Sequence, residues 1–166
     1  ETDDGYRFVF FGVHPPPPSP TEEETSKERD GDLLSVAKRA KKHSLPIIIT
    51  GDFNTVAWSR ISRLFRKASG LIDARYGRGY LATFHAKYWF FRIPLDLLYH
   101  SSDVFIDDLK ILPSVGSDHF PMCCTFYIDK YNDDQEEDVK KLDAEEREEV
   151  EELIEEGKEE ESDNRD

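Results

Sequence analysis

Residues 46–54, Pro-Ile-Ile-Ile-Thr-Gly-Asp-Phe-Asn, are the stretch of sequence that decides the fold. The run from Ile47 to Thr50 is apolar and β-branched without interruption, which is typical of a strand buried on both faces, as in parallel sheets. Asp52 and Asn54 follow the run almost at once. Because open α/β sheets bind their ligands at the carboxyl ends of such strands, the stretch predicts a sheet edge that carries functional polar groups.

Strands and helices are predicted on both sides of this stretch. The strand pattern recurs at residues 6–13, 94–100, 104–112 and 120–128. One helix is expected from a cap at Thr25 or Asp30 to about His43, and a second over residues 56–69 with Gly70 as its stop. The prolines between residues 15 and 20 form a stiff connector. Helices and strands alternate early and strands dominate later, so we predict an α/β or α+β sandwich.

The charge of the chain is strongly segregated. The 166 residues carry a formal net charge of −14. Residues 132–166 hold nineteen acidic against five basic residues, so this tail contains the whole excess and residues 1–131 are neutral. We therefore divide the chain into a domain, 1–131, and an acidic tail. The tail's composition favours disorder, while Val139, Leu142, Val150, Leu153 and Ile154 are spaced so that a partly amphipathic helix is the alternative.

The middle of the domain is basic. Residues 38–92 contain twelve basic residues and only two acidic ones, Asp52 and Asp73. From Arg75 to Phe91 the basic residues are mixed with aromatic ones, in a long loop that we expect to be functional. Such a mixture suits stacking on nucleobases or docking on a lipid interface, and the alternative is aromatic side chains that pack the loop onto the core beside solvated arginines.

Four short motifs lie beside predicted strands: His14-Pro15, Gly51-Asp52-Phe53-Asn54, Pro94-Leu95-Asp96 and Ser117-Asp118-His119-Phe120-Pro121. Each alone is compatible with an ordinary turn. In this order, over residues 6–128, they resemble the later motifs of the endonuclease/exonuclease/phosphatase superfamily, whose members are deoxyribonuclease I-like. The resemblance implies that the chain is the later part of an αββα sandwich with a mixed sheet. It also implies a phosphoester hydrolase that uses Mg²⁺ or Mn²⁺.

The same resemblance implies a role for each motif residue. Asp52 would orient or deprotonate the attacking water, and Asn54 would hold the phosphate and metal-side oxygens. His119 would contact the scissile phosphate while Asp96 holds its far ring nitrogen, and Asp118 would bind the metal. His14 would contact the phosphate and donate a proton to the leaving group. From the basic loop we add Arg78, His85 and Arg92 as candidates for substrate binding.

The family also supplies an Asn and a metal-binding Glu from strands before the one that ends at His14. We therefore expect that this chain lacks them and is incomplete as an enzyme. The sequence around residues 83–96 is similar to that of a bacterial branch of the superfamily. In this branch membrane-spanning segments often precede the catalytic domain, and such segments would tether the domain at a membrane. The resemblance leaves three substrate classes undecided, because relatives act on nucleic acids, sugar phosphates or phospholipid head groups. The alternatives are an inactive partner-binding module with the tail as its contact, and a metal-independent nucleic-acid binder.

Overall fold

The computed structural model describes residues 1–17 and 24–163 and contains two β-sheets. The first sheet has the strand order β1-β2-β4-β3 and is mixed, because β1 runs parallel to β2 while β4 is antiparallel to both β2 and β3. Its strands are β1 (Val9–Val13), β2 (Ile47–Asp52), β3 (Ile72–Asp73) and β4 (Asp96–His100). The second sheet is the antiparallel pair β5 (Val104–Ile111) and β6 (Met122–Ile128).

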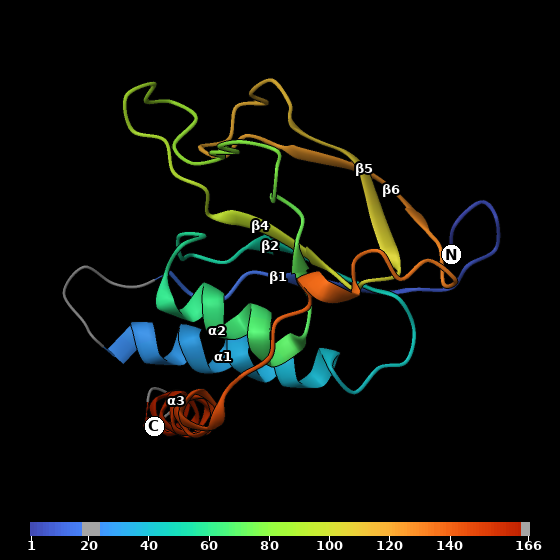
Figure 1. The fold of residues 1–166 in the computed structure, drawn as a ribbon. Helices are drawn as coiled ribbons and strands as arrows, with labels where there is room; N and C mark the ends of the chain where they lie inside the picture. Colours follow the sequence, from blue (N-terminus) through green and yellow to red (C-terminus); the bar gives the residue numbers. More distant parts are fainter. Residues whose placement is uncertain (18–23, 164–166) are drawn as a thin grey trace.

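The helices lie on one side of the first sheet and the β5-β6 pair lies on the other, as Figure 1 shows. They are α1 (Glu24–Ala40), α2 (Arg60–Ser69) and α3 (Ala144–Asp163), with a short 3₁₀ turn, η1 (Glu136–Asp138), before α3. The architecture is therefore a mixed α/β sandwich with two packed sheets, as the sequence predicted.

Two apolar cores hold these layers together. On the helix side, Ile49, Leu97 and Tyr99 of the sheet pack against Leu34 of α1 and Leu64 of α2. On the other side, Ile48 and Leu98 pack against Val104, Ile106 and Ile128 of the second sheet. Alternate residues of β2 and β4 thus enter different cores, which explains why both strands are apolar without interruption.

The predicted strands are confirmed within a few residues at each end, and so is the Thr25 alternative for the first helix, since α1 begins at Glu24, whereas the predicted start of α2 is wrong. Helix α2 begins at Arg60, not at residue 56, because the Ser59 side chain accepts a hydrogen bond from the Ser62 backbone N–H and caps the helix there. Its predicted stop is confirmed, since Gly70 adopts a left-handed φ of 71°. Asp30, the other alternative for the first helix, lies inside α1 and not at its cap. Pro18, Ser19 and Pro20 of the connector lie outside the described residues.

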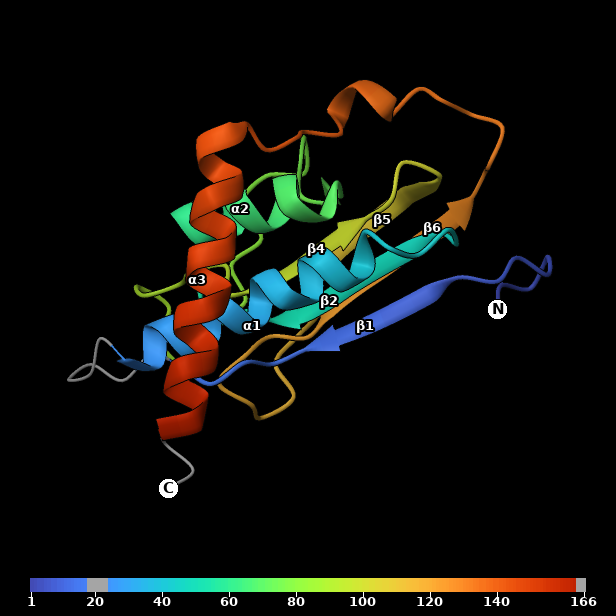
Figure 2. The same cartoon turned by 90° about the horizontal axis from the view of Figure 1, so that it is seen from below.

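The acidic tail contains a helix that packs on α1, the helical alternative for this segment (Figure 2). Val150 and Ile154 of α3 are buried in the helix-side core. The two helices approach closely where Gly31 meets Gly157: a Cβ at Gly31 would lie 2.9 Å from the Gly157 Cα. None of the described helices is long and apolar enough to cross a membrane.

Candidate active site

Three strands of the first sheet bring predicted site residues to one edge. Asp52, at the end of β2, lies directly opposite Asp96, at the start of β4. Val13, the last residue of β1, lies opposite Gly51, so His14 leaves the sheet beside Asp52. His14 and Asp96 are 38 and 44 positions from Asp52 in the sequence. The pairing of β2 with β1 and β4 brings both of them next to Asp52.

Gly51 is required for this close approach. Its φ is 149°, and a Cβ at this position would lie only 1.9 Å from the Val13 carbonyl oxygen. No other residue fits there without separating the ends of β1 and β2. The glycine of the Gly-Asp-Phe-Asn motif thus sets the distance between the strands that carry His14 and Asp52.

The His119 imidazole lies between two carboxylates. Its Nδ1 is 2.7 Å from Asp96 Oδ2, and its Nε2 is 3.6 Å from Asp52 Oδ2. Because an ionised carboxylate only accepts hydrogen bonds, Nδ1 carries a proton and donates a hydrogen bond to Asp96. His14 Nε2 lies 3.9 Å from the same Asp52 oxygen, and its side chain is 76% exposed. The arrangement leaves one imidazole oriented and the other free to meet a ligand from solvent.

The Asp52 carboxylate is partly buried, and this burial raises its pKa above the usual value. The Asn54 backbone N–H donates to Asp52 Oδ1 at 2.8 Å and, together with the charge of His119, acts in the opposite direction. Burial has the larger effect, so Asp52 holds a proton more readily than a carboxylate in water does. A group of this kind can exchange a proton with water at the site.

Asn54 is held by the backbone of two other segments. Its φ of 49° is left-handed, which asparagine tolerates better than most residues. Its Nδ2 donates to the Pro15 carbonyl at 2.9 Å, while Arg29 Nη1 donates to the Asn54 carbonyl at 3.1 Å. These contacts hold the Asn54 side chain at the end of β2, next to Asp52.

The segment from Thr83 to Ala86 supports the Asp96 and His119 strand ends. Thr83, fully buried, accepts a hydrogen bond from the Asp96 N–H at 3.2 Å, and its carbonyl accepts one from the Phe120 N–H at 2.8 Å. The Phe84 ring centroid lies 4.9 Å from that of His119. These contacts hold the Asp96 backbone and place an aromatic ring against His119.

Asp118 lies beside His119 and is exposed to solvent. Its own backbone N–H, aided by the nearby His119, lowers the pKa of its carboxyl group, so Asp118 is ionised at neutral pH. The Asp118 carbonyl accepts a hydrogen bond from the Ala86 N–H at 2.6 Å. Within residues 1–17 and 24–163, no three His, Cys, Asp or Glu side chains are grouped so that they could hold a metal ion.

The three predicted substrate-binding residues are placed differently. His85 follows Phe84, and its ring packs against Tyr88 at 4.5 Å. Arg92 lies with its Cζ 4.8 Å from the Phe120 ring, next to His119. Arg78 is not brought to this edge: its guanidinium donates to the carbonyls of Ala74, Tyr76 and Ile106, near the far end of β4. Backbone acceptors thus occupy Arg78.

The predicted basic surface is partly neutralised by the tail. On α2, Arg60 pairs with Glu149 and Lys67 pairs with Glu146, while Lys38 of α1 lies 2.6 Å from Glu151. These cations are therefore not free for phosphate. The aromatic side chains from Tyr88 to Phe91 are at least half exposed and do not pack the loop onto the core.

Sequence reasoning missed Arg29, Gly51 and Thr83 as supports of the site. Only Gly51 gave a local signal, because a glycine directly before a functional residue at a strand end indicates a close backbone approach. The contacts of Arg29 with Asn54 and of Thr83 with Asp96 join segments that are separated in the chain. No local sequence pattern therefore predicts them.

The endonuclease/exonuclease/phosphatase family model matches residues 1–119. The chain belongs to this family. Its fold is also that of solved members. An endonuclease/exonuclease/phosphatase family protein from Bacteroides thetaiotaomicron superposes with a TM-score of 0.60 at 20% identity, covering 77% of this chain and 53% of that one. No curated protein sequence gives a significant match.

Two further solved structures with this fold are of named proteins. A mannosyl-6-phosphatase from Bacteroides thetaiotaomicron gives a TM-score of 0.59 at 21% identity and covers 76% of this chain and 53% of its own. The catalytic domain of human Nocturnin, with bound sulfate, gives 0.58 at 21% identity and covers 76% and 49%. The chain thus spans about half of the length of these structures, and at such identities the likeness extends to the fold alone.

Proposed function

We propose that the protein to which this chain belongs hydrolyses phosphoester bonds with the help of Mg²⁺ or Mn²⁺. The observation that carries the proposal is the His119 imidazole, held by Asp96 at 2.7 Å and facing Asp52 at 3.6 Å. An imidazole in a fixed tautomer beside a carboxylate of raised pKa is suited to binding a phosphate and moving a proton to or from water. Membership of the family supports the same chemistry.

Each residue has a distinct task in this proposal. Asp52 orients the attacking water and accepts its proton. The atom that does so is Oδ2, because Oδ1 already accepts the hydrogen bond from the Asn54 N–H. In the imidazolium form His119 donates a hydrogen bond from Nε2 to the scissile phosphate, while Asp96 accepts one from Nδ1. Exposed His14 contacts the phosphate from solvent and protonates the leaving group. Asn54 contributes its amide group to the phosphate oxygens.

Among the described residues this edge offers one oxygen donor for a hard divalent cation and not a complete set of ligands. The ionised, exposed Asp118 carboxylate is the residue that would hold it, and carboxylate oxygens are the ligands that Mg²⁺ and Mn²⁺ prefer. When bound, the cation neutralises negative charge on the phosphate oxygens. We further propose that an upstream Asn and Glu complete the site, which the coverage of about half of the solved relatives supports.

The experiment measures hydrolysis of bis-p-nitrophenyl phosphate, a generic diester, with Mg²⁺ or Mn²⁺. It uses this chain and the chain joined to the upstream part of its gene product. We expect His119→Ala and Asp52→Ala each to lower kcat/KM about 10³-fold or more in the active form. His43→Ala is the matched control, because His43 is exposed, packs against Phe11 of β1 and precedes the amino end of β2, whereas Asp52 lies at the carboxyl end of that strand. Full activity in both site variants, or no hydrolysis by the longer protein, contradicts the proposal.

The pH dependence follows from Asp52. Water activation needs the ionised carboxylate, and burial raises the pKa of Asp52. Activity should therefore fall as the pH decreases through a value above the usual 3.8 of an aspartate. The substrate stays open among nucleic acids, sugar phosphates and phospholipid head groups, and a panel of the three classes with the same variants identifies it.

A further inference from the structure

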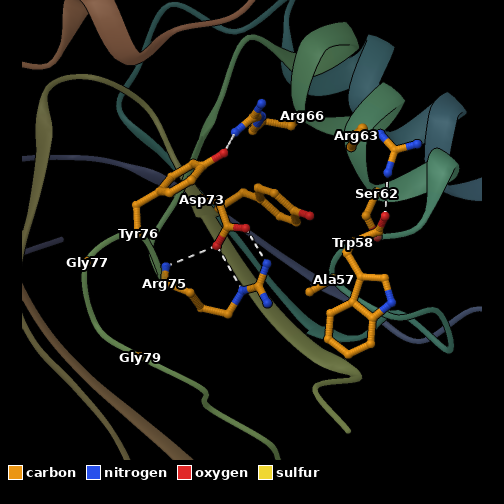
Figure 3. A pocket seen from close by; sticks show the side chains of 11 residues that line it. Ala57, Trp58, Ser62, Arg63, Arg66, Asp73, Arg75, Tyr76, Gly77 and Gly79 are labelled. Carbon is orange, nitrogen blue, oxygen red and sulfur yellow. Dashed lines mark hydrogen bonds and ion pairs between the residues drawn. The ribbon is translucent and has the colours of Figure 1, made fainter.

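A second pocket lies away from the catalytic edge, between α2 and the segment of residues 73–79. Its volume is about 450 Å³, and Figure 3 shows it from close by. Tyr99 contributes to its wall and belongs to the helix-side core. In the ladder, Tyr99 pairs with Asp73, three residues beyond the Asp96 position that pairs with Asp52. The pocket therefore opens on the helix side of the sheet, apart from His119.

The pocket carries uncompensated positive charge. Arg75 is neutralised, because its Nε donates to Asp73 Oδ1 at 2.9 Å and its Nη2 contacts Oδ2. Arg63 and Arg66 have no carboxylate partner anywhere in the described part of the chain: their guanidinium groups donate to the Trp58 carbonyl and to the Tyr76 hydroxyl. The buried Nε of Arg66 has no hydrogen-bond partner among these residues. Two guanidinium groups thus face a pocket that holds no free carboxylate.

An exposed aromatic surface borders these arginines. The Trp58 side chain is 54% exposed and lines the pocket beside Ala57 (Figure 3). Tyr80 stacks on its ring, with the two planes 23° apart, and thereby fixes the indole. Gly77 and Gly79 form the rim with φ values of 73° and 80°, and a Cβ at either would meet nothing within 4 Å. The rim of the pocket is therefore open at these two glycines.

Guanidinium groups bind phosphate through paired hydrogen bonds, and tryptophan stacks on aromatic rings. We propose that this pocket binds a nucleotide, with its phosphate on Arg63 and Arg66 and its base on Trp58. The nucleotide is either a free nucleoside monophosphate or the terminal nucleotide of a strand. This binding needs neither a metal ion nor the catalytic edge, so it stands or falls independently of the proposed hydrolysis.

The chain offers a direct reporter, because it contains only two tryptophans and Trp89, 82% exposed, can be replaced by Phe. In the Trp89→Phe protein without metal, AMP should quench Trp58 fluorescence. Adenosine and inorganic phosphate should each bind at least about tenfold more weakly, since each fills one half of the site. A 5′-phosphorylated trinucleotide that binds more tightly than AMP would identify a strand end as the ligand, and the reverse order would identify the free nucleotide.

Charge removal provides the specific test. Arg63→Ala and Arg66→Ala should each weaken AMP binding about tenfold, because charge-assisted hydrogen bonds are lost. Arg63 is exposed, so its removal leaves the fold intact, which near-ultraviolet circular dichroism checks. Arg7→Ala, at another exposed arginine outside the pocket, should change nothing. The proposal is overturned if AMP does not quench, if phosphate alone binds as well as AMP, or if His119→Ala weakens AMP binding as much as Arg63→Ala does.

Discussion

The His119 site and the contact of α3 with α1 and α2 both pair a basic side chain with carboxylates, but the pairs have different roles. At the site, one imidazole lies between two carboxylates that strand register has already placed opposite each other. At the α3 contact, pairs such as Lys27–Glu156 join long side chains that are both about half exposed. Strand register and a hydrogen bond position the side chains in the first region, whereas attraction neutralises surface charge in the second. Substitutions in the first should therefore change activity, and those in the second should change stability.

The largest effect should come from Gly51→Ala, which attacks the backbone geometry that the first region depends on. The added Cβ would lie 1.9 Å from the Val13 carbonyl oxygen, so β1 and β2 must separate. We expect a loss of about 3 kcal/mol or more in the free energy of unfolding, measured by urea denaturation, together with loss of activity. Gly79→Ala also places a Cβ at positive φ but in open space, and it should cost only about 1 kcal/mol.

Asp96→Asn should separate positioning from folding. Asparagine keeps the shape of the side chain but no longer holds the Nδ1 proton of His119 as a carboxylate does. We expect kcat to fall about 100-fold, with a shifted pH profile, while the unfolding midpoint hardly changes. Partial recovery in Asp96→Glu would support a positioning role. An unchanged pH profile in both variants would show that Asp96 does not act through the imidazole.

Glu146→Gln should have a smaller effect, on stability alone. The hydrogen bond from Lys67 lowers the pKa of Glu146, so its contribution is present above the unfolded pKa and is lost as the pH falls through the lower folded value. We expect a loss of about 1 kcal/mol at pH 7 that disappears in acid, measured by thermal unfolding at several pH values. An equal loss at pH 7 and pH 3 would contradict this assignment.

The smallest effect should follow Lys38→Met. Lys38 and Glu151 are exposed to 42% and 62%, so water and salt screen their attraction. We expect a change below about 0.5 kcal/mol in the free energy of unfolding and none in activity. If this pair cost as much as Glu146→Gln, the whole α3 contact would have to be regarded as one cooperative charge network.

The order of the four motifs and the apolar runs predicted most of the sheet and the meeting of Asp52, Asp96 and His119 at one edge of it. The strands could be predicted because alternate residues of β2 and β4 enter two different cores, so consecutive residues in each strand are apolar. The start of α2 was not predicted correctly, because Ser59 competes with residue 56 as a helix start and only the Ser62 contact decides between them. The membrane tether stays a prediction.

The tail illustrates what composition conceals. Its few apolar residues suggested at most a partly amphipathic helix, yet a local signal was present. Asp143 and Glu146 form a capping box, in which each backbone N–H donates to the other's carboxylate, at 3.1 and 2.9 Å. The fit of Gly157 against Gly31, in contrast, joins residues 126 positions apart in the chain and gives no local pattern.

The placement of α3 also gives the molecule an electrical direction. The helix holds much of the acidic excess and lies on the outer side of the helix layer, whereas the β5-β6 sheet lies on the opposite side of the molecule (Figure 1). Such a separation of charge forms a molecular dipole, and its field orients an approaching polyanion before any contact is made. Encounters should therefore be guided away from the tail, and raising the ionic strength should reduce that guidance.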